Sequence, residues 1–144
     1  MKLGLDIHGV IDKYPEQMIK LAQDTMKRGG RVYIITGPPA DKARQEMIDL
    51  MVKYMISKPF WNQIYSIVDW MKQKGIPHHT DANGHVWALR EHDWNAVKGQ
   101  IAVELGLDLH IDDSEEYGEY FPPGVFVHMK NKDKKDVRAN VLVS

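Results

Sequence analysis

Residues 1–12 read MKLGLDIHGVID, and this stretch decides how the rest of the chain is interpreted. The apolar run from Leu3 to Ile7 is too short for a helix and predicts a buried strand. A lone carboxylate, Asp6, comes near the end of this strand, and Gly9 follows where the chain can turn sharply. Charged side chains are seldom buried unless they are paired or bind a metal, so Asp6 is a candidate site residue. The alternative is that Asp6 only caps a turn.

Length and composition limit the classes of protein to consider. The chain has 144 residues, of which 43% are hydrophobic, and we expect one domain over residues 1–144. The 19 basic and 20 acidic residues give a net charge of −1, which indicates no general attraction to nucleic acids or anionic membranes. A local basic patch stays open. The absence of cysteine excludes disulfides, zinc sites built on thiolates and cysteine nucleophiles.

The sequence shows neither a signal-peptide pattern at its start nor an apolar run long enough to span a membrane. We therefore expect a soluble, cytoplasmic protein with no membrane partner. The charge-dense segment from Lys130 to Arg138 is expected to form a solvated helix face or helix end.

Strand-like and helix-like patterns alternate along the chain. Apolar spacing predicts helices over residues 15–28, 43–54, 60–74 and 93–105, and strands over residues 3–7, 31–36, 76–80, 107–111 and 125–129. Asn83-Gly84 predicts a tight turn, and hence a small hairpin after the strand at 76–80. This alternation predicts a three-layer, Rossmann-like α/β domain. Its mainly parallel sheet has about five strands, with helices on both faces.

Polar residues stand where several of these strands end. Asp6, Thr36, Asp112 and Asp113 each come at or just after the end of a predicted strand, and Lys98 lies on the helix that leads to the last of them. Right-handed crossovers place the carboxyl ends of all parallel strands at one edge of the sheet, so these side chains are expected to converge. Three converging carboxylates repel one another unless a cation joins them, and oxygen ligands favour Mg²⁺.

Four motifs in this order resemble those of the haloacid dehalogenase superfamily of phosphohydrolases: Asp6-Ile-His-Gly9-Val-Ile-Asp12, Ile-Ile-Thr36-Gly37, Lys98, and Ile111-Asp112-Asp113-Ser114. The resemblance spans residues 3 to about 129 and depends on the order of the motifs rather than on any one of them. It implies a phosphatase, a Mg²⁺-dependent hydrolase of phosphomonoesters that forms an aspartyl-phosphate on its first motif.

The resemblance also implies a role for each motif position. The catalytic residues would be Asp6, His8, Thr36 and Lys98, with Asp6 as the nucleophile. The phosphoryl group would be bound by Gly9, Thr36, Gly37 and Lys98. The metal ligands would be Asp6, Asp112, Asp113 and the backbone carbonyl of His8.

His8 departs from the pattern of the family. Phosphatases of this superfamily usually carry a second Asp at this position, which protonates the leaving group and then activates water. Imidazole can exchange protons near neutral pH, so hydrolysis remains possible with His8. The alternative is a slow or non-hydrolytic protein of the same fold that binds or transfers phosphate. Asp12 is expected to cap the following turn or helix.

Two other site classes fit less well. Receiver domains of response regulators use similar residues, but their acidic pair comes early and the phosphorylated Asp later, the reverse of the order found here. A zinc site could draw on neighbouring histidines, but their spacing matches no familiar zinc motif, and hairpin histidines are mostly surface residues. These histidines are His78, His79, His85 and His92.

The substrate expected from the resemblance is a phosphorylated small molecule or an exposed phosphate on a larger molecule. Neither the segment between Asp12 and Arg31 nor residues 38–95 leaves room for a full cap domain, so the site is expected to be open. Contact with nucleic acid and a homo-oligomer that covers the site both stay open. Trp87, near the predicted hairpin, is a candidate for contact with substrate or with a second subunit, whereas Trp70 and Trp94 are expected to pack.

Overall fold

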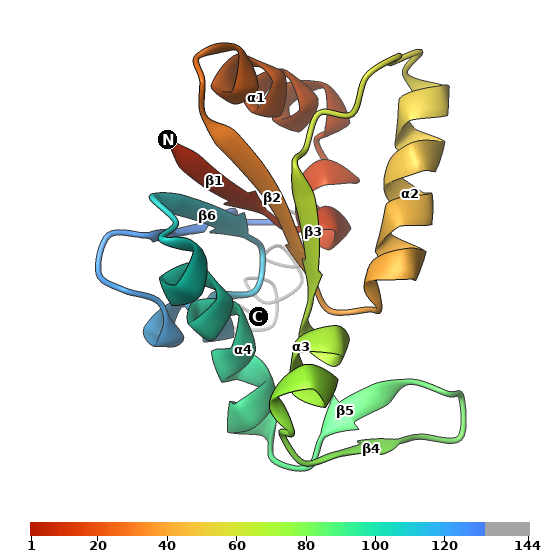
Figure 1. The fold of residues 1–144 in the computed structure, drawn as a ribbon, viewed down its shortest axis with the longest axis vertical. Helices are drawn as coiled ribbons and strands as arrows, with labels where there is room; N and C mark the ends of the chain where they lie inside the picture. Colours follow the sequence, from red (N-terminus) through yellow and green to blue (C-terminus); the bar gives the residue numbers. More distant parts are fainter. Residues whose placement is uncertain (132–144) are drawn as a thin grey trace, which may run out of the picture.

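Five parallel strands form the central sheet of the computed structural model, which describes residues 1–131 (Figure 1). Their order across the sheet is β3-β2-β1-β6-β7. These strands are β1 (Lys2–Leu5), β2 (Arg31–Thr36), β3 (Gln63–Ser66), β6 (Leu109–Asp112) and β7 (Phe126–His128). The helices are α1 (Pro15–Lys27), α2 (Ala40–Lys53), α3 (Ile67–Lys74) and α4 (Glu91–Leu105). Two short helical segments are η1 (Ile7–Ile11), a π-type turn, and η2 (Glu115–Tyr120), a 3₁₀ helix. A separate antiparallel hairpin consists of β4 (His78–Thr80) and β5 (Val86–Ala88).

The sheet has helices and a hydrophobic core on both of its faces. Along β2, Val32 and Ile34 belong to the core that includes buried residues of α1 and α2, while Tyr33 and Ile35 belong to the core with α3 and α4. A strand buried on both faces has to be apolar at successive positions, as VYII is. The predicted three-layer, Rossmann-like architecture is therefore confirmed, including the number of strands in the sheet.

The order of the strands creates a crevice beside β1. Leu5 of β1 pairs with Ile34 of β2 on one side and with Ile111 of β6 on the other. The chain first adds strands on the β2 side and later adds β6 and β7 on the opposite side, so the direction of winding reverses between β1 and β6. Ligands of open α/β sheets bind at such a switch point, beyond the carboxyl ends of the strands.

The region from residue 60 to residue 80 differs from the sequence prediction. Residues 63–66 form β3, whereas the apolar spacing predicts helix there. The two patterns are confused because Ile64 and Ile67, three positions apart, also fit one face of a helix. The helix begins only at Ile67, after Ser66, whose hydroxyl accepts a hydrogen bond of 3.1 Å from the Asp69 amide. The strand predicted at 76–80 is shortened to β4, lies in the hairpin rather than in the main sheet, and is exposed along its length.

Smaller corrections concern α4 and the end of the chain. Asp93 was predicted to cap α4, but the helix begins at Glu91, and the Asp93 carboxylate accepts a hydrogen bond of 3.0 Å from Nε of Arg90. The predicted charged helix after Lys130 falls almost wholly on residues outside the described range. Within residues 1–131, no helix combines the length and apolar character needed to cross a membrane.

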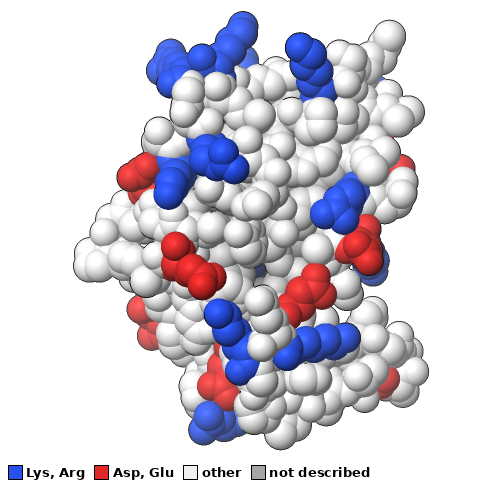
Figure 2. All heavy atoms as spheres, viewed as in Figure 1, with Lys and Arg blue, Asp and Glu red and all other residues white. Residues whose placement is uncertain are grey.

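Charges are distributed unevenly over the face drawn in Figure 2. Lys and Arg side chains gather at its upper edge, whereas both signs alternate lower down, towards the carboxyl ends of the strands. In the lower part of this face, the described side chains form no continuous basic surface.

Candidate active site

Asp6 is the first residue after β1 and lies at the crevice between β1 and β6. Its amide donates a hydrogen bond of 3.1 Å to the carbonyl of Ile111, which ties it to the neighbouring strand. Its Oδ1 accepts a hydrogen bond of 2.9 Å from the amide of Ile7, and the side chain is buried, with 6% of the residue exposed. The carboxylate is thus held by the backbone at the point where the strand ends.

A tight turn follows Asp6 and depends on glycine. Gly9 has a φ of +83°, a conformation that other residues rarely adopt, and a Cβ at this position would collide with the carboxylate of Asp113. The Gly9 amide donates a hydrogen bond of 2.7 Å to Oδ1 of Asp12. Asp12 therefore stabilises the turn that precedes it, whereas we expected it to cap the following turn or helix. The N-cap of α1 is Tyr14.

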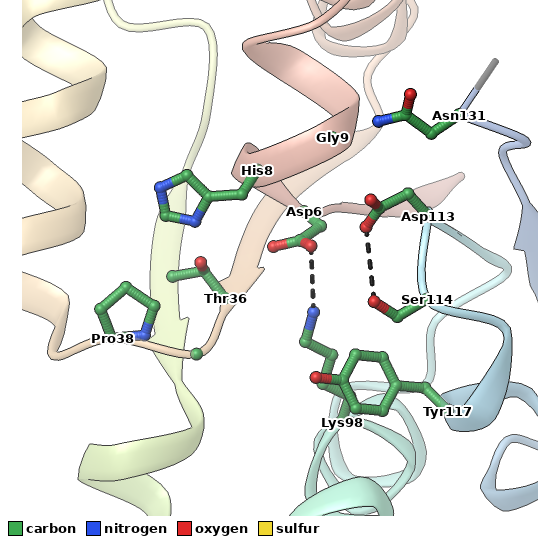
Figure 3. A pocket seen from close by; sticks show the side chains of 11 residues that line it. Asp6, His8, Gly9, Thr36, Pro38, Lys98, Asp113, Ser114, Tyr117 and Asn131 are labelled. Atoms are coloured by element: carbon green, nitrogen blue, oxygen red, sulfur yellow. Dashed lines mark hydrogen bonds and ion pairs between the residues drawn. The ribbon is translucent and has the colours of Figure 1, made fainter. Parts of the chain in front are cut away.

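A buried lysine joins two of the predicted site carboxylates. Lys98, on α4, is 1% exposed, and its Nζ lies 2.6 Å from Oδ2 of Asp112. The same Nζ lies 3.4 Å from Oδ2 of Asp6 (Figure 3). Asp112, the last residue of β6, is fully buried. A buried carboxylate needs a counter-charge, and Lys98 supplies one to both partners. The ion pairs link the end of β1, the end of β6 and the middle of α4.

One ammonium shared by several carboxylates affects them unequally. Burial raises the pKa of Asp6 to about 7, and Lys98, the next largest influence, opposes this only in part, while the negative charges of Asp112 and Asp113 add to it. Burial also works to raise the pKa of Asp112, but the closer ammonium of Lys98 and the hydrogen bond from His110 hold it well below its usual range. Asp112 is the stronger ion-pair partner, and Asp6 remains insufficiently compensated.

Three carboxylates form a group that could hold a metal ion. Asp6, Asp112 and Asp113 each offer an oxygen, and these oxygens all lie within 4.8 Å of one another. In the described part of the chain they are the one such group of His, Asp or Glu side chains. Hard divalent cations such as Mg²⁺ prefer oxygen ligands of this kind, and an added positive charge would offset the poor compensation of Asp6. The donor set therefore fits Mg²⁺.

The remaining predicted residues line one open pocket of about 460 Å³. Thr36, the last residue of β2, is fully buried, and its hydroxyl has no hydrogen-bond partner among the described residues. A buried hydroxyl without a partner loses the hydrogen bonds it had in water, which destabilises the protein by roughly 1–3 kcal/mol. A ligand with acceptor oxygens in the pocket would satisfy it. The walls of the pocket are formed by Asp6, His8, Gly9, Thr36, Gly37, Pro38, Lys98, Asp113, Ser114, Tyr117 and Asn131.

His8 lies on the α2 side of the pocket, opposite Tyr117 and Lys98 (Figure 3). Its Nε2 is 2.8 Å from Oε2 of Glu46, a residue of α2 that sequence reasoning missed. Glu46 follows the buried Ala43 by three positions and so borders the buried face of α2. Its position at the edge of this face is the only feature of the sequence that points to Glu46. It does not predict the hydrogen bond with His8, which lies 38 residues earlier.

His110 is a second residue that sequence reasoning missed. It is fully buried one position before Ile111, and its Nε2 lies 2.9 Å from Oδ2 of Asp112. Burial lowers the pKa of His110, so its ring is neutral and donates this hydrogen bond through Nε2. The ring stacks on Phe121 with centroids 5.1 Å apart, and the adjacent strand has Gly4 where a Cβ would collide with it. His110 thus fixes the orientation of the Asp112 carboxylate.

The histidines of the alternative zinc site do not gather. His78 and His85 belong to the hairpin and contact the carbonyl of Ile76 and the carboxylate of Asp81, respectively. The metal-binding group within residues 1–131 contains none of the four histidines. As expected, Trp70 is buried and Trp94 packs in the core next to α3 and α4, whereas Trp87 is 43% exposed.

Comparisons with models of protein families, with curated proteins and with solved structures find no match to this chain.

Proposed function

We propose that this protein is a Mg²⁺-dependent phosphomonoester hydrolase that works through an aspartyl-phosphate on Asp6, as in the haloacid dehalogenase superfamily. The observation that carries the proposal is the meeting of Asp6, Thr36, Lys98 and Asp113 around one pocket at the switch point of the sheet. The buried Asp112 is paired with Lys98 and completes the carboxylate group with Asp6 and Asp113. A carboxylate nucleophile, a buried ammonium, a hydroxyl in need of a partner and a carboxylate triad are each what phosphoryl transfer requires.

The metal has a defined set of ligands in this proposal. Asp6, Asp112 and Asp113 would hold Mg²⁺ together with the backbone carbonyl of His8, and the ion would supply positive charge against the phosphoryl oxygens. Lys98 and the hydroxyl of Thr36 would bind the same oxygens from the protein side, helped by the backbone amide of Gly37.

The reaction has two displacement steps at phosphorus. A carboxylate oxygen of Asp6 forms a bond to phosphorus while the bond from phosphorus to the ester oxygen breaks, and His8 gives a proton to the departing oxygen. In the second step His8 takes a proton from water, whose oxygen attacks the phosphorus of the aspartyl-phosphate and releases phosphate and Asp6. Because Nε2 of His8 is paired with Glu46, Nδ1 is the ring nitrogen that exchanges these protons.

The pocket is open, which suits a phosphate carried on a substrate of any size. The inserted segment between α3 and α4 is only the hairpin β4-β5, which is far smaller than a cap domain. A second copy of the chain that covers the pocket would restrict the substrates to small molecules. Both arrangements remain compatible with the proposed chemistry.

A second candidate function is favoured by the contact between His8 and Glu46. It draws the imidazole towards α2, and a ring held there would leave hydrolysis slow, as in a protein that binds or transfers phosphate. The variant His8→Asp separates the two. An increase in hydrolysis would identify His8 as a weak substitute for the usual Asp, and a decrease would identify it as adapted to a particular leaving group.

The experiment that tests the proposed function is phosphate release from a panel of phosphomonoesters, with Mg²⁺ and with EDTA. Wild type and Asp6→Asn are assayed in parallel, because Asn keeps the shape of Asp and removes the nucleophile. We expect release only with Mg²⁺ and only with Asp6. Full activity of Asp6→Asn would refute the covalent mechanism, and binding of Mg²⁺ without release from any ester would favour the second candidate.

A further inference from the structure

Tyr117 is a pocket residue with no place in the four motifs. It belongs to η2, and its ring lies beside Lys98, whose Nζ is 4.6 Å from the ring centroid. Figure 3 shows its hydroxyl on the side of the ring that faces Thr36 and Pro38. The ring therefore shields the Lys98 ammonium, while the hydroxyl reaches the space where the phosphoryl group is proposed to bind.

Two glycines fix the position of η2, and hence of Tyr117. A Cβ at Gly99 of α4 would collide with the backbone carbonyl of Tyr120, so the backbone of η2 lies directly against this helix. A Cβ at Gly118 would lie 2.9 Å from the ring of Phe126, on β7. Contacts this close to backbone and ring atoms leave η2 little freedom to shift, which is the requirement for a precisely placed side chain.

The hydroxyl of Tyr117 is oriented by a tryptophan. Nε1 of Trp94, on α4, donates a hydrogen bond of 3.2 Å to Oη of Tyr117. An indole N–H can only donate, so the hydroxyl is the acceptor and its own hydrogen is not used in this bond. Burial raises the pKa of Tyr117, which keeps that hydrogen in place at neutral pH. Tyr117 can thus donate a hydrogen bond into the pocket.

Trp94 is itself held from two sides. A Cβ at Gly37, another pocket residue, would lie 3.3 Å from Cζ2 of Trp94, so the indole is in close contact with the turn after Thr36. Its other neighbour is Trp87 of the hairpin, with ring centroids 4.9 Å apart. Trp87 is held in turn by a hydrogen bond of 3.0 Å from its Nε1 to Oδ2 of Asp81. These contacts connect the hairpin to the pocket through Trp94.

We propose that Tyr117 is a substrate-contacting residue, whose hydroxyl donates a hydrogen bond to a non-bridging oxygen of the bound phosphoryl group, and that Trp94 is the residue that positions it. This inference rests on the proposed function, because it takes the pocket to be a phosphate site. It adds a donor opposite His8 and beside Lys98, and it gives the hairpin a role in supporting the site.

The test uses variants that remove one hydrogen-bonding group each. Tyr117→Phe keeps the ring beside Lys98 and removes the hydroxyl, and Trp94→Phe keeps an aromatic ring between Gly37 and Trp87 and removes the N–H. Tyr120→Phe is the matched control, because Tyr120 lies on the same short helix but does not line the pocket. The measurements are orthophosphate affinity by calorimetry with Mg²⁺, kcat/KM for the best ester, and the melting temperature of each variant.

We expect Tyr117→Phe to lower orthophosphate affinity and kcat/KM by about 10-fold or more, because it removes a hydrogen bond from the Tyr117 hydroxyl to a charged phosphoryl oxygen. Trp94→Phe should lower both by about 3-fold, since the hydroxyl remains but is less well oriented. The double variant should be no worse than Tyr117→Phe alone, because Trp94 acts through the hydroxyl. Tyr120→Phe should match the wild type in every measurement.

The outcomes separate this inference from the proposed function. Unchanged affinity and kcat/KM in Tyr117→Phe would overturn the inference and leave the hydrolase intact. Additive losses in the double variant would overturn the positioning role of Trp94. Weaker orthophosphate binding in Tyr117→Phe, in a protein that hydrolyses no ester, would support the inference and overturn the hydrolase. A wild type that binds no orthophosphate would overturn both.

Discussion

Lys98 donates a hydrogen bond of 2.6 Å from Nζ to Oδ2 of Asp112, and both side chains are almost completely buried. The same ammonium lies 3.4 Å from Asp6, so a single cation serves two carboxylates in the interior. Burial works to lower the pKa of Lys98, but Asp6 and Asp112 outweigh it and raise the pKa, which keeps the ammonium charged.

Removal of the ammonium should destabilise the protein. We expect Lys98→Met to lower the free energy of unfolding by about 3–5 kcal/mol, because it leaves two buried carboxylates without a counter-charge. Urea unfolding in EDTA would measure this loss. The double variant Lys98→Met with Asp112→Asn should recover part of the stability, because it also removes one of the two buried carboxylates that Lys98→Met leaves without a counter-charge. A double variant that shows the full sum of the two single losses would contradict the ion-pair account.

Stability should depend on pH through Asp6. The pKa of Asp6 in the folded protein, about 7, lies above its unfolded value of 3.8. Asp6 therefore makes its full contribution to the free energy of unfolding below pH 3.8, and this contribution is lost as the pH rises through 7. The pKa of Asp112 is shifted in the opposite direction, and its contribution is lost only in acid. We therefore expect the melting temperature in EDTA to fall between about pH 5 and pH 8 in the wild type, and to fall less in Asp6→Asn.

Addition of Mg²⁺ extends this experiment. The cation would bind the ionised form of Asp6, so the rise in melting temperature on adding Mg²⁺ should be larger near pH 8 than near pH 5. Parallel pH profiles for the wild type and Asp6→Asn would show that another group is responsible for the pH dependence.

Thr36 provides a contrast between stability and function. Thr36→Val replaces a hydroxyl that has no partner in the described part of the chain with a methyl group of similar size. We expect the free energy of unfolding to stay the same or to rise by up to about 1 kcal/mol, while orthophosphate affinity falls about 10-fold. Thr36→Ser, which keeps the hydroxyl, should bind orthophosphate nearly as well as the wild type. A clear loss of stability in Thr36→Val would show that the hydroxyl has a structural partner.

His8 acts in both steps of the proposed reaction, and Glu46 acts through it. An activated aryl ester such as p-nitrophenyl phosphate isolates the second step, because its phenolate leaves without a proton. With this ester we expect His8→Ala to release one rapid equivalent of phenolate per enzyme and then to turn over slowly, because Asp6 is phosphorylated but water is not activated. Glu46→Gln should slow turnover by about 3- to 10-fold in the same way, since the imidazole loses the carboxylate that holds it. Asp41→Asn, at the exposed start of the same helix, is the control. Stopped-flow measurement of the released phenolate would detect the burst, and a uniform loss without one would contradict these roles.

The sequence was sufficient to predict most of the sheet and the residues at its carboxyl edge. Asp6 stands out because an apolar run is interrupted by one charge, and parallel strands bring Thr36 and Asp112 to the same edge whatever the details of the helices. The β3 strand was mistaken for helix because Ile64 and Ile67 have a spacing that suits both, and local periodicity cannot separate a four-residue strand from the helix that follows it.

The supporting residues could not be predicted because their roles depend on tertiary contacts. Nothing near Glu46 in the sequence indicates that α2 brings it within hydrogen-bonding distance of His8. In the sequence, His110 is a single polar residue within a predicted strand. Its ring has room beside Asp112 because the adjacent strand carries Gly4, and this contact depends on the tertiary structure. Tyr117 reaches the pocket because η2 packs closely against α4, a contact that the spacing of residues does not specify.

The most direct test of the central claim is to look for the covalent intermediate itself. The protein is incubated with Mg²⁺ and an activated aryl phosphate, whose leaving group needs no proton from His8, quenched in acid within milliseconds, digested and examined by mass spectrometry. The account predicts one added phosphoryl group on the peptide that contains Asp6, at a higher level in His8→Ala, and none in Asp6→Asn or in EDTA. Hydrolysis that requires Mg²⁺ but leaves Asp6 unmodified in His8→Ala, or places the phosphoryl group on another residue, would contradict it.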